Sequence, residues 1–228
     1  MLTTWVDTLN LAKNDKGSQR SILGYAGESL VIGRALVCGY NLFFKAWRDS
    51  KYDAVLDYRG SLYRIEIKQF GKAQTSVSTT SGGRSGEQIS RAARSRAQVL
   101  SATECDFLIA VESLSGKCWI VPTEVIEILG KPRLTVSALT PFSENWSLFM
   151  NSHRYVNADG QSSPLRHRSI KELKKLHADI GLSGTPPSSF QPTRRHKAIE
   201  IESQRDRLAL AIWIQHAQLA NVGSRGRR

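Results

Sequence analysis

Apolar and polar residues alternate over two neighbouring runs of the chain, 52–58 and 62–70. Both runs are rich in β-branched and aromatic residues, and Arg59, Gly60 and Ser61 separate them. Runs of this kind joined by a short segment that contains Gly are typical of a β-hairpin. We therefore predict two adjacent antiparallel strands over these ranges.

Charged residues occupy one face of the predicted hairpin. Successive side chains of a strand point to opposite faces, so Glu66 and Lys68 share a face. Ile65 and Ile67 then point the other way, into a core. Asp53, from the first strand, is expected to meet Glu66. Two carboxylates with an ammonium beside them suit a divalent metal and an activated water, because hard cations such as Mg²⁺ prefer oxygen ligands.

A helical pattern precedes the hairpin. Apolar residues recur at helical spacing over 29–37, and Gly39 directly after them is a helix stop. Residues 41–44 then form a short strand-like segment. Glu28, at the start of the pattern, is therefore expected to lie on a helix that packs beside the hairpin.

A second predicted hairpin follows, with strands at 106–111 and 117–122 and a turn at Ser115 and Gly116. A short helix begins after it, at Thr123. Strands and helices in this order predict an α/β fold, with a mixed central β-sheet flanked by helices.

Two polar segments lie between the hairpins. Residues 71–86 are rich in Ser, Thr and Gly, and we expect a long loop that is mobile without a ligand. Residues 87–100 are expected to form a helix with a basic stripe. Hydroxyl, amide and guanidinium groups donate to phosphate oxygens, so both segments are candidate phosphate contacts. A plain surface loop and a solvated helix face are the alternatives. The candidate residues are Ser76, Ser78, Arg84, Arg91 and Arg94.

The character of the chain changes after about residue 142. Residues 151–228 hold 14 Lys and Arg against six Asp and Glu. We therefore divide the chain into a core, 1–142, and a basic, partly helical C-terminal extension, 143–228, for DNA binding or oligomerisation. The extension's candidate DNA contacts are Arg166, Arg168, Arg194 and Arg195.

The extension carries two predicted helices. The first, 169–176, begins at a Ser cap with Glu172 three residues later. A segment rich in Gly, Pro and Ser, 181–192, is expected to be a linker. The second helix, 198–220, has a broad apolar surface, which must pack on the chain's own core or on a second subunit.

Composition agrees with a nucleic-acid partner. The net charge is +12, with an isoelectric point near 9.9, and such a balance attracts phosphate. No apolar run approaches the roughly 18 to 20 residues that span a bilayer, and the first residues do not resemble a secretion signal. Cys38, Cys105 and Cys118 are expected to be buried, reduced thiols. These features predict a cytoplasmic, DNA-associated protein.

The order of Glu28, Asp53 and Glu66-Ile67-Lys68 resembles the PD-(D/E)XK nuclease superfamily. The resemblance covers about residues 18–123, and it is to the branch of homing endonucleases and Holliday junction resolvases. Tyr52 stands where the pattern has proline.

The resemblance implies a restriction-endonuclease-like core and a Mg²⁺-dependent endodeoxyribonuclease, with Mn²⁺ able to substitute. Asp53, Glu66, Glu28 and the Ile67 carbonyl would bind the metal, and Lys68 would complete the catalytic set. Gln69 would contact DNA or pack. The partner implied is double-stranded DNA, cut by a homodimer or a higher homo-oligomer.

Several functions remain compatible with the sequence. A homing or restriction enzyme would cut duplex DNA at a defined site, whereas a resolvase would recognise branched DNA. The chain would otherwise be a catalytically silent DNA-binding protein, or a subunit that cuts only within a larger transposition or defence complex.

Overall fold

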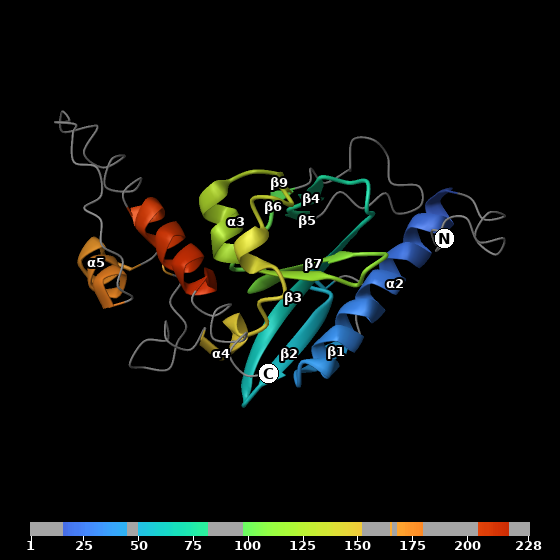
Figure 1. Ribbon diagram of the computed structural model, residues 1–228, viewed down its shortest axis with the longest axis horizontal. Helices are drawn as coiled ribbons and strands as arrows, with labels where there is room; N and C mark the ends of the chain where they lie inside the picture. The colour runs from blue at the N-terminus through green and yellow to red at the C-terminus, as the bar shows by residue number, and fades with distance from the viewer. Residues whose placement is uncertain are drawn as a thin grey trace.

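A five-stranded mixed β-sheet forms the centre of the molecule in a computed structural model (Figure 1). The structure describes residues 16–44, 50–81, 98–151, 165, 168–179 and 205–218. The strand order is β1-β2-β3-β7-β8, in which β3 and β7 are parallel and the other neighbours are antiparallel. The strands are β1 (Asn41–Phe44), β2 (Ala54–Tyr58), β3 (Ser61–Phe70), β7 (Phe107–Glu112) and β8 (Cys118–Pro122). The predicted α/β fold with a mixed sheet is therefore confirmed.

The first hairpin has the predicted form. β2 pairs with β3 from Ala54 opposite Ile65 to Tyr58 opposite Ser61. Arg59 (φ 51°) and Gly60 (φ 84°) make the tight turn. Positive φ values at both central residues are typical of a type I′ turn, whose twist matches that of the two strands of a hairpin. This turn fixes the register that places the charged residues of β3.

Helices cover the sheet. α2 (Lys16–Val37) packs against β1, β3 and β7, and α3 (Thr123–Leu129) follows β8. Short helices come next: η3 (Thr140–Phe142), α4 (Leu148–Asn151) and α5 (Ile170–Asp179). A further helix spans 205–218. One hydrophobic cluster joins sheet residues to Val31 of α2, Ile126 of α3 and Ile212 of the last helix.

Local signals located several elements correctly. The helix stop before β1, the second hairpin, α3 and the capped helix α5 all lie where the sequence predicts them. At α5 the Ser169 backbone N–H donates to Glu172 Oε2 (2.7 Å), and the Glu172 N–H donates to Ser169 Oγ (3.3 Å). This reciprocal pair is the predicted capping box.

The prediction of an unstructured loop over 71–86 is wrong for residues 76–81, whereas residues 71–75 lie outside any strand or helix. Residues 76–81 form β4 (Ser76–Ser78) and β5 (Thr80–Ser81), with Val77 and Thr79 buried. β4 pairs with β9 (Arg133–Thr135), and β5 pairs with β6 (Gln98–Val99). The local sequence is polar, and pairing with distant strands overrides it.

Two further expectations need correction. The helix predicted over 87–100 does not extend to its end, because Gln98–Val99 is strand β6; residues 87–97 lie outside the described residues. Cys38 is exposed, whereas Cys105 and Cys118 are buried as expected, and all three are free thiols. Cys38 follows the last residue of α2, so its position at the helix end explains the exposure.

No helix in the described ranges combines the length and the apolar character that a bilayer span requires.

Candidate functional site

Glu66 and Lys68 lie on one face of β3, as the alternation predicts. Lys68 Nζ pairs with Glu66 Oε1. Only 9% of the Glu66 side chain is exposed, whereas 27% of the Lys68 side chain is. A largely buried carboxylate is therefore held by a cation that still reaches the surface.

Asp53 lies directly before β2, against the backbone of β3. Its N–H donates to the carbonyl of Ile65 (2.8 Å), and its Oδ2 accepts a hydrogen bond from the N–H of Ile67 (2.9 Å). The carboxylate is thus fixed next to the Glu66-Ile67 peptide. The Asp53 carboxylate therefore lies against the stretch of β3 that carries Glu66 and Lys68.

The carbonyl of Ile67 points to the same side as Asp53. The N–H and C=O of one strand residue face the same neighbouring strand. Ile65 and Ile67 direct these groups to the Asp53 side, whereas the Arg64 carbonyl accepts from Asp106 on the β7 side (2.8 Å). Asp53 and the Ile67 carbonyl therefore offer hard oxygens on this side of β3, and Glu66, which carries a further carboxylate, directly precedes Ile67 in the strand.

Glu28 lies on α2, half-buried, beside a close helix–strand contact. A Cβ atom at Gly27 would lie 2.6 Å from Gln69 Cβ and 3.6 Å from Val111 Cγ1. Only glycine allows α2 to approach the sheet at this point. Among the described residues no three or more His, Cys, Asp and Glu side chains gather closely enough to hold a metal ion. Glu28 therefore does not join Asp53 and Glu66 in a three-carboxylate cluster.

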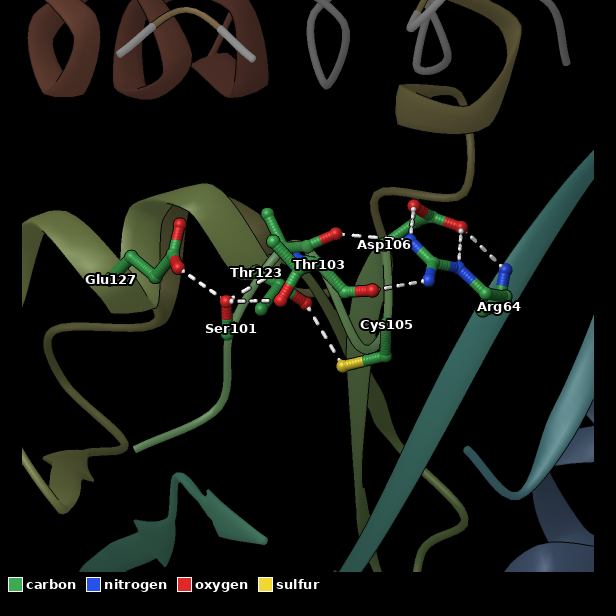
Figure 2. A network of polar contacts seen from close by, with 8 residues as sticks. Arg64, Ser101, Thr103, Cys105, Asp106, Thr123 and Glu127 are labelled. Carbon is green, nitrogen blue, oxygen red and sulfur yellow. Dashed lines mark hydrogen bonds and ion pairs between the residues drawn. The ribbon is translucent and has the colours of Figure 1, made fainter. Parts of the chain in front are cut away.

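Arg64, which was not among the predicted site residues, lies on the same face of β3 as Glu66 and Lys68. Arg64 binds Asp106 through Nε (3.1 Å) and a terminal nitrogen (2.8 Å), and it also donates to the carbonyls of Thr103 and Ala102 (Figure 2). The Asp106 hydrogen bonds raise the pKa of Arg64 above its usual value. This contact fixes the 101–106 segment against β3.

The 101–106 segment carries further contacts around the site. Glu104 pairs with Lys51 (3.2 Å), two residues before Asp53, and accepts from Ser81 Oγ (3.2 Å). Burial raises the pKa of Cys105 to about 12, and the nearby carboxylate of Glu66 adds to the shift. Cys105 therefore stays a neutral thiol beside the carboxylates. Arg64 alternates with Glu66 and Lys68 along β3, so the sequence could have placed it on their face. No local pattern identifies Asp106 as its partner.

The other candidate DNA contacts are scattered. Gln69 lies on the opposite face of β3 from Lys68, where its Cβ approaches Gly27. Ser76 and Ser78 are half-buried on β4, and Arg168 lies half-buried before α5. The remaining candidates lie outside the described residues: Arg84, Arg91, Arg94, Arg166, Arg194 and Arg195.

Comparisons with known proteins find a likeness to a solved structure. No known family model matches the sequence, and no curated protein is similar to it. A solved structure of a bacterial homing endonuclease superposes with a TM-score of 0.49 at 17% sequence identity, over 59% of this chain and 95% of that one.

Proposed function

We propose that this chain is a metal-dependent DNA endonuclease that cuts duplex DNA at defined sites, as homing and restriction enzymes do. One observation carries the proposal: Asp53 is bound to the backbone of Ile67, between the buried Glu66 and the partly exposed Lys68. Two carboxylates and a cation on neighbouring strand positions support the catalytic roles that the PD-(D/E)XK resemblance implies.

The oxygen donors fit a magnesium ion. Mg²⁺ is commonly bound through one or two carboxylates, with waters and substrate phosphate completing its shell. Asp53, Glu66 and the Ile67 carbonyl would hold it, and Glu28 would act through a water, since it does not join a three-carboxylate cluster. Mn²⁺ would substitute. The bound ion would supply Lewis acidity and a lowered pKa for its water.

The proposed reaction is hydrolysis of a phosphodiester bond by water. The water oxygen attacks phosphorus in line with the P–O3′ bond, which breaks to leave a 5′-phosphate. The water loses a proton, and the leaving 3′ oxygen gains one. Lys68, whose Nζ pairs with Glu66, would orient this water and offset negative charge on the phosphate.

Two copies would cut the two strands. The strands of a duplex are antiparallel, so a homodimer with a twofold axis would place one site on each. Leu208, Ile212 and Trp213 are buried within their own chain. The dimer contact would therefore lie elsewhere than on the buried side of the last helix.

Cleavage of supercoiled plasmid and of a synthetic four-way junction tests the function. We expect discrete linear fragments with Mg²⁺ or Mn²⁺ and none with EDTA. Asp53→Asn and Glu66→Gln should abolish cutting, while Arg59→Asn, which removes a charge at the hairpin turn, should not. Cutting of the junction alone would indicate a resolvase. Salt-sensitive binding without cleavage of either substrate would contradict the proposal and indicate a DNA-binding subunit.

A further inference from the structure

The two-stranded sheet of β4 and β9 presents an outward face of hydroxyls and one guanidinium. Ser76 lies opposite Thr135, and Ser78 lies opposite Arg133. Val77 and Leu134, between these residues, are buried, so the alternation places the other four side chains on the opposite face, where Arg133 and Thr135 are exposed and Ser76 and Ser78 are half-buried. We call these four residues the ribbon face: Ser76, Ser78, Arg133 and Thr135.

Arg133 uses only some of its N–H donors to bind the neighbouring strand β4. Its Nε donates to Ser76 Oγ (3.1 Å), and a terminal nitrogen reaches the Ser76 carbonyl (3.4 Å). A guanidinium has five N–H donors. The side chain is exposed, so it is oriented by Ser76 and still has donors to offer a ligand.

The ribbon face is uniformly suited to an anionic partner. β4 reads Ser-Val-Ser and β9 reads Arg-Leu-Thr, so neither strand contains a carboxylate that would repel phosphate. Ser137 Oγ donates to Thr135 Oγ1 (3.1 Å) and extends the row of hydroxyls. The side chains other than Arg133 are short, which lets a DNA backbone approach the sheet closely.

The ribbon is adjacent to the candidate site along the chain. β4 follows β3 after a turn in which the Gln74 N–H donates to the Gly71 carbonyl (2.9 Å). In Figure 1, β4 and β9 gather with β5 and β6 beyond the central sheet. A DNA duplex that reached Lys68, near the end of β3, would therefore run close to the ribbon.

We propose that the ribbon face contacts the sugar–phosphate backbone of duplex DNA, with Arg133 donating to a phosphate. The proposal rests on the proposed function for its partner, and it adds a binding surface to it. Ser, Thr and Arg donors are those that commonly fix a protein's register on the duplex backbone. A two-stranded ribbon is also narrow enough to enter the major groove, about 12 Å wide.

The test is the salt dependence of binding, measured by fluorescence anisotropy of a labelled duplex in EDTA, so that cleavage plays no part. Each neutralised phosphate contributes about 0.9 to the slope of log affinity against log salt. We expect Arg133→Ala to lower the slope by about 0.9 and to weaken binding about fivefold, as for one exposed charge pair. Arg133→Lys should keep the slope.

Two controls separate contact with DNA from a structural role. Arg59→Asn removes one positive charge at the opposite end of β3 and should leave the slope unchanged. Ser76→Ala removes the anchor of Arg133 but keeps its charge, so the slope should also persist. Loss of slope in Ser76→Ala, together with a lower unfolding midpoint in both variants, would indicate a structural pair and overturn the proposal.

The remaining outcomes distinguish this inference from the proposed function. A wild-type slope for Arg133→Ala, in a protein that cleaves DNA, would overturn the ribbon alone. Binding with the expected loss of slope, in a protein that never cleaves, would overturn the nuclease and support the ribbon. A wild-type protein that binds no duplex would overturn both.

Discussion

Lys68 gives the sharpest prediction at the scale of single residues. Its ammonium is paired with Glu66 and partly exposed, so it can serve both the carboxylate and a substrate. We expect Lys68→Ala to lower single-turnover cleavage by about 10²- to 10³-fold, the usual loss when a group that stabilises transition-state charge is removed. Duplex binding in EDTA should fall far less, because one charge of many is lost.

The matched control for Lys68→Ala is Arg59→Asn, which also removes one charge from the first hairpin. Asn tolerates the positive φ of that turn position. A cleavage rate for Lys68→Ala within threefold of wild type would remove Lys68 from the catalytic set.

The three thiols should differ in reactivity. Burial raises the pKa of both Cys105 and Cys118 to about 12, so these groups remain protonated at pH 8. Cys38 is exposed, although partial burial raises its pKa too. The thiolate is the reactive form, so we expect one slowly labelled thiol in the native protein and three in urea. Colorimetric titration measures this, and Cys38→Ser should abolish the native signal; native labelling of two or three thiols would contradict the described packing.

Part of the site was predictable from the residues alone. Alternation along β3 is a local property, and it placed Glu66 and Lys68 on one face. The bidentate contact of Arg64 with Asp106 depends on the parallel pairing of β3 with β7. No local pattern encodes that register, because the two residues are 42 positions apart in sequence.

At the scale of elements, Gly27 sets the distance between α2 and the sheet. A methyl group there would meet the stem of Gln69 rather than a flexible end, so the helix must shift. We expect Gly27→Ala to lower the free energy of unfolding by about 1–3 kcal/mol, the usual cost of overpacking, and to impair cleavage by displacing Glu28. Urea unfolding and the plasmid assay measure the two effects.

Gly33 supplies the matched control in the same helix. An added Cβ there meets nothing within 4 Å. Gly33→Ala should therefore stabilise the protein by about 0.5–1 kcal/mol, since Ala is the better helix former. Equal effects of the two substitutions would show that the close contact at Gly27 is not formed.

Elements with strong local signals were predictable, and those that depend on distant partners were not. The conformations of the turn at Gly60 and of the capping box at Ser169 follow from residues within a few positions of each other. The conformation of the 76–81 segment depends on a distant partner. β4 is a strand because it pairs with β9, which follows the second hairpin and α3 in the sequence. Its buried Val77 and Thr79 alternate, but among so many Ser and Thr residues the pattern is weak.

At the scale of the whole molecule, the last described helix belongs to the core. Asn145 Nδ2 donates to the Ala217 carbonyl (2.6 Å), and Trp213 Nε1 donates to Glu124 Oε2 on α3 (2.8 Å). The sequence predicted an apolar helix here and left both its own core and a second subunit open as partners. Amphipathic pattern alone cannot choose between them, because either surface would bury the same side chains.

The contact between Trp213 and Glu124 predicts how the chain unfolds. Leaving a buried polar group without its hydrogen-bond partner costs about 1–3 kcal/mol, so Trp213→Phe should lower the free energy of urea unfolding by that amount. Because the helix shares one hydrophobic cluster with the sheet, the transition followed by far-UV circular dichroism should move as a whole. The double variant with Glu124→Gln should be less destabilised than the sum of the two single variants, as expected for residues in contact. A separate early transition, with the main midpoint unchanged, would instead show that the helix folds independently of the sheet.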